Sequence, residues 1–183
     1  FISTLLVTII IGYMSSHIIR IKKITIKSDK IKNLQKIVFI SDIHLGSNSI
    51  LHFKKILNKI IFIDPKIILI GGDLIDNSSF DLNTLEILKK VKVPIYFVTG
   101  NHEYYIKNSK QKINKLKSFN INVLDNSSVL FEEINIIGLS DNISLNQKKS
   151  NYFTHKLNNI FNLVLVHKPN LWKKINQDCD LML

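Results

Sequence analysis

The chain has 183 residues, enough for one domain with its own core, and 45% hydrophobic with 21% charged residues excludes a disordered or collagen-like chain. Its single cysteine, Cys179, excludes an internal disulfide framework and is expected to be a buried apolar residue. The net charge is +11, but Arg20 is the only arginine among 25 basic residues and the lysines are scattered, so nucleic-acid binding is not expected.

Residues 1–19 carry no Asp, Glu, Lys or Arg. As a helix they would span roughly 28 Å, close to the thickness of a bilayer core. No small-residue cleavage site follows, so we expect a transmembrane anchor over residues 1–20 rather than a signal peptide or a buried core helix. Residues 21–35 are predicted to form a basic linker or a first strand, and their lysines place the following domain in the cytoplasm and suit anionic lipid headgroups.

Short apolar runs then alternate with helical periodicities. Buried strands are predicted over residues 36–40, 66–70, 94–98 and 163–166, shorter β-like pieces near residue 123 and over 129–131, 134–139 and 181–183, and helices over 51–63, 82–90 and 109–119. Continuous apolar strands separated by helices indicate an α/β fold with a mostly parallel sheet that is covered on both faces. In such sheets the ligand site lies outside the carboxyl ends of the strands.

Polar side chains follow four of these predicted strands. The candidate site residues are Asp42, His44, Asp73, Asp76, Asn101, His102 and His167. Each alone also suits an ordinary turn or a helix N-cap, but their coincidence at strand ends favours a shared site. No phosphate-binding Gly-rich loop and no nucleophilic Ser elbow is present in the sequence.

Carboxylates and imidazoles without thiolates suit Mn, Fe, Zn or Mg. The number of candidates exceeds the needs of one ion. A site for two divalent metal ions needs a ligand that can bridge them, and a carboxylate such as Asp73 can do so.

Four ordered motifs carry a family resemblance over residues from about 37 to the end of the chain. They are Asp42-x-His44, Gly72-Asp73-x-x-Asp76, Gly100-Asn101-His102-Glu103 and a later His167. In this order they resemble the calcineurin-like metallophosphoesterase superfamily. The charge-free N-terminus, residues 101–105, a Gly-x-x-Asp piece at 138–141 and the His-x-Pro turn at 167–169 resemble its membrane-anchored bacterial branch.

The resemblance implies a truncated four-layer α/β/β/α sandwich over residues 36–183, preceded by the transmembrane helix. It implies the following roles: Asp42 and His44 bind one metal, Asp73 bridges, Asn101 and His167 bind the second, and His102, oriented by Asp76, acts as acid or electrostatic stabiliser. A metal-bridging hydroxide would hydrolyse a phosphodiester, pyrophosphate or phosphomonoester. The branch implies a lipid-linked substrate such as UDP-diacylglucosamine, and the membrane as a partner.

The family's last motif, Gly-His-x-His, follows an apolar strand, whereas this sequence ends at residues 180–183. We therefore expect a fragment of a longer protein that lacks one ligand for each metal and is itself inactive. Two alternatives stay open: a nucleotide phosphodiesterase or nuclease of the same superfamily, and a non-catalytic scaffold or membrane-surface binding protein. No protein partner is inferred.

Overall fold

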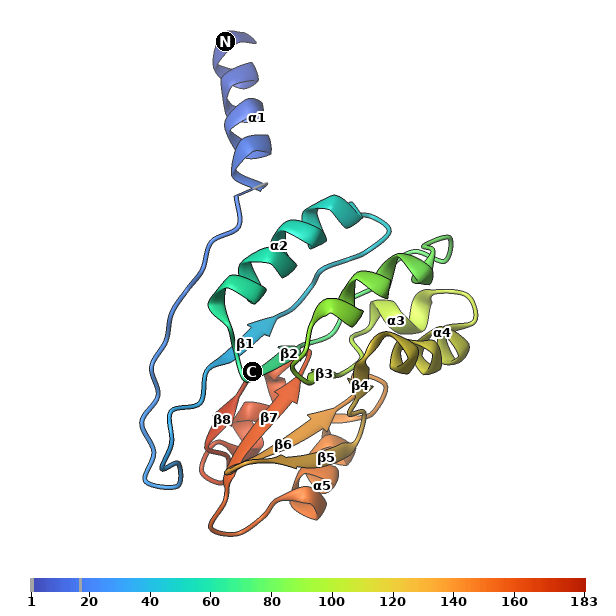
Figure 1. The fold of residues 1–183 in the computed structure, drawn as a ribbon. Helices are drawn as coiled ribbons and strands as arrows, with labels where there is room; N and C mark the ends of the chain where they lie inside the picture. The colour runs from blue at the N-terminus through green and yellow to red at the C-terminus, as the bar shows by residue number, and fades with distance from the viewer. Residues whose placement is uncertain (1, 17) are drawn as a thin grey trace.

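Two four-stranded sheets pack against each other in the computed structural model, which describes residues 2–16 and 18–183 (Figure 1). The first sheet has the parallel order β1 (Ile37–Ile40), β2 (Ile67–Ile70), β3 (Ile95–Phe97), β4 (Ile121–Val123). The second has the order β5 (Ser127–Phe131), β6 (Ile134–Leu139), β7 (Phe161–Val166), β8 (Leu181–Met182), in which only β5 pairs antiparallel with its neighbour.

Helices lie on the outer face of each sheet. Those associated with the first sheet are α2 (Ile50–Ile63), the 3₁₀ helix η1 (Leu82–Lys90), α3 (His102–Tyr105), α4 (Ser109–Leu116) and the 3₁₀ turn η2 (Lys117–Phe119). Those associated with the second sheet are α5 (Leu145–His155), the 3₁₀ turn η3 (Pro169–Leu171) and α6 (Trp172–Ile175). Figure 1 shows α2 beside the first sheet and α5 below the second.

Strand β2 shows why four layers form. Its four residues are all apolar and all buried. Because side chains alternate along a strand, Ile68 and Ile70 pack toward the outer helices while Ile67 and Leu69 pack between the sheets. A third cluster, which includes Tyr152 of α5, covers the far side of the second sheet. The α/β fold with two sheets that the family resemblance implied is confirmed.

The segment over residues 82–90 is helical as predicted, but it is a 3₁₀ helix rather than an α-helix. Its buried residues Leu82, Leu85 and Leu88 are spaced by three. A 3₁₀ helix has three residues per turn, so this spacing aligns them on one side of η1. The sequence contained that signal, which the prediction treated as ordinary amphipathicity.

The N-terminal helix is shorter than predicted. Helix α1 (Ile2–Ser16) contains 15 residues, about 22 Å at the usual rise per residue, and it projects away from the sheets in Figure 1. The prediction covered residues 1–20, of which 1 and 17 lie outside the described residues, and residues 18–20 are not helical. Among the described residues no helix combines the length and apolarity needed to cross a membrane.

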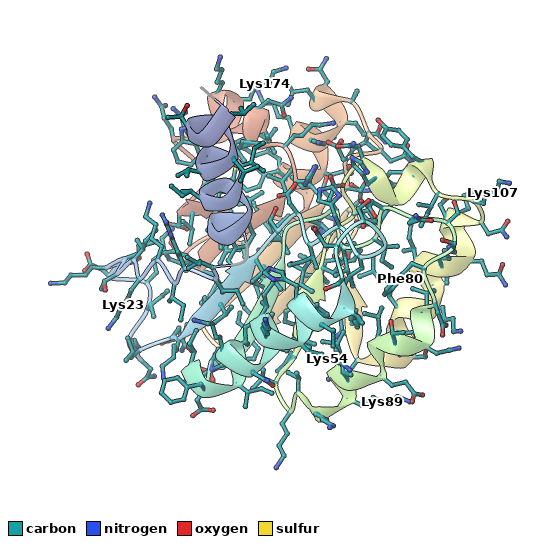
Figure 2. The ribbon with its side chains drawn as sticks, turned by 90° about the horizontal axis from the view of Figure 1, so that it is seen from above. Lys23, Lys54, Phe80, Lys89, Lys107 and Lys174 are labelled. Atoms are coloured by element: carbon teal, nitrogen blue, oxygen red, sulfur yellow. The ribbon has the colours of Figure 1, made fainter. Side chains whose placement is uncertain are left out.

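Residues 18–36 form neither helix nor strand. The lysines labelled in Figure 2 are spread over the molecule rather than gathered on one face. In the view from above, Lys23, Lys89, Lys107 and Lys174 lie toward different edges of the molecule, and Lys54 lies on α2 (Figure 2). Such a distribution agrees with the sequence-based argument against a nucleic-acid surface, which needs clustered basic residues.

Candidate metal centre

The loops that follow β1 and β2 run side by side and continue the pairing of the sheet. The N–H groups of Asp42, His44 and Leu45 donate to the carbonyls of Gly72, Asp73 and Leu74 at 3.2, 2.9 and 2.8 Å. Three residues of these loops have left-handed backbones: Asp42 (φ 55°), His44 (φ 51°) and Asp73 (φ 51°). Each such conformation costs on the order of 1–3 kcal/mol and is typical of functional sites.

Two glycines let the loops approach one another. Gly72 has a φ of +90°, and a Cβ there would lie 2.8 Å from His167 Nδ1. A Cβ on Gly100 would overlap with Asp73 Oδ1. The absence of both side chains therefore permits the convergence of residues from β2, β3 and β7.

Asp73 lies at the centre of this convergence. Its Oδ2 atom is 3.3 Å from His167 Nε2, 3.8 Å from His44 Nε2 and 4.0 Å from His102 Nε2. Its Oδ1 atom accepts the backbone N–H of His102 at 2.9 Å, which fixes the carboxylate. One oxygen is thus held by the backbone, and the other faces three imidazoles.

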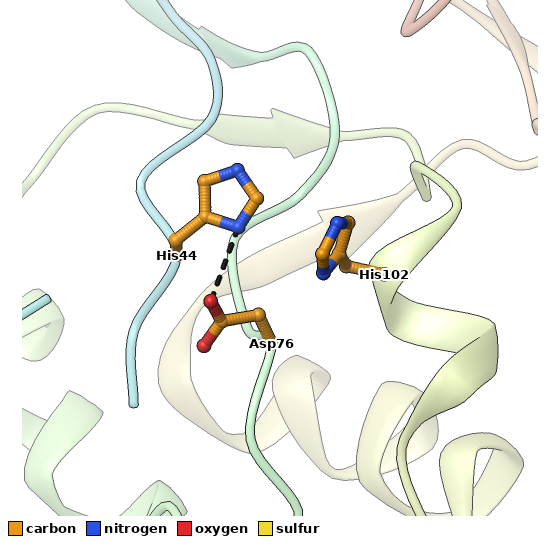
Figure 3. Close-up of side chains that lie close together, drawn as sticks. All are labelled: His44, Asp76 and His102. Carbon is orange, nitrogen blue, oxygen red and sulfur yellow. Dashed lines mark ion pairs between the residues drawn. The ribbon is translucent and has the colours of Figure 1, made fainter. Parts of the chain in front are cut away.

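Hydrogen bonds on the opposite ring nitrogens set the orientation of two of these histidines. His167 Nδ1 is 2.9 Å from the carbonyl oxygen of Gly71, which can only accept a hydrogen bond. His44 Nδ1 is 3.2 Å from Asp76 Oδ2, the contact drawn in Figure 3. A proton on each Nδ1 leaves each Nε2 with a lone pair directed at Asp73, the arrangement that metal-ligating histidines adopt.

The residues fit a divalent cation. Two groups of ligand atoms lie within 4.8 Å of one another among the described residues: Asp42, His44 and Asp73, and His44, Asp76 and His102. Ligands that share one ion at about 2.0–2.2 Å lie roughly 3–4 Å apart, which matches the distances from Asp73 Oδ2 to His167 and His44. The donors are carboxylate oxygen and imidazole nitrogen without sulfur, which suits borderline or hard cations.

Exposure increases from the floor of the centre to its mouth. The Asp73 side chain is 4% exposed, His44 25%, His102 39% and Asp42 56%. The His102 ring packs edge-on against His44 and, on its outer side, against the exposed Tyr105. His102 is therefore more accessible than Asp73 and His44, and less accessible than Asp42.

Asn101 and Asp76 differ in how the structure places them. Asn101 is half-buried at the N-cap of α3, where its side chain makes no capping hydrogen bond, between Gly100 and His102. Asp76 was expected to orient His102, but its ion pair is with His44, and its Oδ1 accepts the N–H of Ser47 at 3.0 Å. Asp76 still lies close to His102, as Figure 3 shows.

Glu103 was quoted in a motif but given no role. It is 1% exposed and accepts three backbone N–H groups: Gly100 at 2.8 Å and Asp73 at 3.0 Å on one oxygen, and Ile75 at 2.9 Å on the other. Burial raises the pKa of this carboxyl, and these bonds oppose that shift. Its position directly after His102 was the only feature of the sequence that could have indicated this role.

A second group of charges lies beside the centre and was also missed. Lys148 and Lys168 bind the two oxygens of Asp141 at 2.9 and 2.6 Å. Burial alone would raise the pKa of Asp141, but the hydrogen bonds from the two lysines outweigh it, so the pKa is lowered. The hydrogen bond to Asp141 raises the pKa of Lys168, and the charge of Asp73 acts in the same direction.

Comparisons with known proteins agree with this geometry. The chain is 32% identical over 130 residues to an uncharacterized metallophosphoesterase of Campylobacter jejuni, which covers 66% of this chain and 33% of that protein. It is 36% identical over 105 residues to a bovine transmembrane protein with metallophosphoesterase domain, which covers 53% of this chain and 23% of that protein. The chain thus spans about a third or less of these relatives' lengths.

The fold and the family are shown independently. A solved crystal structure superimposes with a TM-score of 0.51 at 14% identity, covering 71% of this chain and 67% of that chain, which shows a likeness of fold. The model of the calcineurin-like phosphoesterase family matches residues 35–181, a range that contains every residue of the centre. The chain therefore belongs to the calcineurin-like phosphoesterase family, whose members are metal-dependent hydrolases.

Proposed function

We propose that the full-length protein hydrolyses a phosphoester with divalent metal ions held by Asp42, His44, Asp73, Asn101 and His167, within a catalytic domain over residues 36–183. The convergence of three imidazole Nε2 atoms within 4.0 Å of Asp73 Oδ2 carries the proposal. Asp73, whose Oδ2 faces His44, His102 and His167, would be the ligand shared by both ions in this scheme. When bound, such ions lower the pKa of water and stabilise the negative charge of the displacement.

His102 supplies the proton-transfer or electrostatic function. It is more exposed than His44, its Nε2 lies 4.0 Å from Asp73 Oδ2, and imidazole is the side chain that most often transfers protons in enzymes. From this position it can donate a proton to a leaving oxygen or stabilise the charge on the phosphoryl group. Asp76 serves as a positioning residue that keeps the Nδ1 proton on His44, and hence the Nε2 lone pair toward the centre.

We further propose that the domain works at a membrane, on the cytoplasmic side, with a lipid-linked phosphoester such as UDP-diacylglucosamine as substrate. Helix α1 exposes Leu5, Leu6 and Ile9, which are 59–63% accessible. Basic residues that suit anionic headgroups follow it. The bovine relative is named a transmembrane protein, which supports a membrane location for this chain. Retention of the full-length protein in the pellet after carbonate extraction is expected, and its release would contradict the anchor.

Metal content and turnover of bis(p-nitrophenyl) phosphate test the central proposal. In the full-length protein, Asp73→Asn should remove nearly all hydrolysis and lower the bound metal, because the carboxylate contacts every imidazole of the centre. Asp81→Asn is the matched control, since Asp81 caps η1 and belongs to none of the ligand groups. Wild-type turnover in Asp73→Asn would refute the mechanism.

A further inference from the structure

One charged group next to the metal centre has no role in the proposed hydrolysis. Asp141 lies two residues after the end of β6. It binds Lys148 of α5 through Oδ1 and Lys168 through Oδ2. The side chains of Asp141 and Lys148 are only 6% and 4% exposed, whereas that of Lys168 is 51% exposed. The group therefore has a buried ion pair and one accessible ammonium.

The charges of this group do not cancel. One carboxylate faces two ammonium groups, which leaves one excess positive charge. Lys148 is buried and needs the carboxylate, because an unpaired buried charge is strongly unfavourable. The excess charge consequently lies at the accessible end, on Lys168.

Lys168 lies next to the centre along the chain, and Asp141 holds its ammonium there. Lys168 directly follows His167, whose Nε2 is 3.3 Å from Asp73 Oδ2. Pro169 restricts the preceding residue to extended geometry, and Lys168 has φ −102° and ψ 117°. Asp141, which holds the ammonium, is tied to the same region because its N–H donates to the carbonyl of Thr99, next to Gly100. The Lys168 ammonium also interacts electrostatically with Asp73 and Tyr105.

We propose that Lys168 is a specificity-determining residue that binds a second negatively charged group of the substrate, beside the phosphoryl group at the metal centre. The proposal rests on the proposed function for the site of the first phosphoryl group. An ammonium prepositioned by Asp141 can form a charge-assisted hydrogen bond with an adjacent phosphate oxygen without first being ordered. Substrates with two neighbouring anionic groups would then be preferred over those with one.

Equilibrium binding of ADP and AMP to the full-length protein in Mn²⁺ tests this idea, because the two probes differ by one phosphate. Wild-type protein should bind ADP more tightly than AMP. Lys168→Met should weaken ADP binding about tenfold more than AMP binding, the value of one charge-assisted hydrogen bond, and Lys168→Arg should recover most of the difference. Lys173→Met is the matched control, since Lys173 is an exposed lysine of α6 and should change neither affinity.

Equal loss of ADP and AMP affinity in Lys168→Met would overturn the proposal, as would a wild-type protein that does not prefer ADP. Hydrolysis of bis(p-nitrophenyl) phosphate, which has one negative charge, is measured on the same samples. Its absence in wild-type protein would refute the proposed function, while the ratio of ADP to AMP affinity would still report on Lys168. Equal melting temperatures of Lys168→Met and Lys173→Met exclude a merely structural effect.

Discussion

Glutamine in place of Glu103 should loosen the metal centre without removing any of its ligands. The Glu103 carboxylate joins the loop after β2 to the loop after β3, because it accepts N–H groups from Asp73 and Ile75 on one side and from Gly100 on the other. It therefore fixes the backbone on which Asp73 stands. Glutamine has nearly the same volume, so the substitution changes the hydrogen bonding rather than the packing.

The expected size of the effect follows from the number of hydrogen bonds that each side chain can accept. A carboxylate can accept all three N–H groups, but an amide has one accepting oxygen and one NH₂ group that can only donate. If the amide oxygen keeps the bonds to Asp73 and Gly100, the NH₂ group faces the N–H of Ile75 and one buried bond is lost. A buried unsatisfied donor costs about 1–3 kcal/mol, so we expect Glu103→Gln to lower the free energy of unfolding by about 1–3 kcal/mol.

Urea denaturation of the metal-free protein measures this change, and metal affinity should fall as well because the Asp73 backbone is released. Glu86→Gln is the control: the Glu86 side chain is 64% exposed in its pair with Lys89, and such surface pairs contribute little. The control should stay within about 0.5 kcal/mol of wild type. A Glu103→Gln protein as stable as this control would show that the three bonds do not hold the two loops together.

Three further outcomes follow from the same structure. His102→Ala should leave metal content mostly intact and lower turnover by ~10²–10⁴-fold if the imidazole is a general acid, whereas complete loss of metal would assign it as an essential ligand. Asp141→Asn should destabilise the protein by about 3–5 kcal/mol at neutral pH, because Lys148 loses its buried partner. Since the folded pKa of Asp141 is lowered, its contribution is present above the unfolded value near 4 and is lost as the pH falls through the folded value; denaturation curves at pH 7 and pH 3 should therefore show a difference between wild type and Asp141→Asn that shrinks in acid, and a constant difference would contradict the ion pair. Burial raises the pKa of the Cys179 thiol to about 11, so a disulfide reagent at pH 8 should react with it only after denaturation, and rapid labelling of the native protein would refute that burial.

Much of the site could be predicted because parallel strands have their carboxyl ends at one edge. Ile37–Ile40, Ile67–Ile70 and Ile95–Phe97 are parallel neighbours, as the apolar runs indicated. The polar residues that follow them must then meet, whatever the connecting helices do. His167 follows β7 in the other sheet, so its convergence with Asp73 depended on packing that no local pattern encodes.

Helix α5 shows what the sequence could not predict. Of its eleven residues, only Lys148 and Tyr152 are fully buried, so the helical period of apolar residues is nearly absent. A hydropathy pattern assigns every lysine to the surface, so it could not indicate that Lys148 is buried. The partner of Lys148, Asp141, lies seven positions away along the chain. The helix is stabilised by tertiary contacts, and local propensity alone did not indicate it.

The position of His167 makes the metal centre part of the contact between the two sheets. The ring joins Gly71 and Asp73 at the edge of the first sheet to the end of β7 in the second, above the core that includes Leu69 and Leu165. Three left-handed residues in the same loops store backbone strain that the surrounding hydrogen bonds must offset. A cation that bound Asp73 and His167 together would add a further link across this contact, and binding to the folded state alone raises stability in proportion to the logarithm of the metal concentration. Metal binding and the packing of the two sheets are therefore expected to change together.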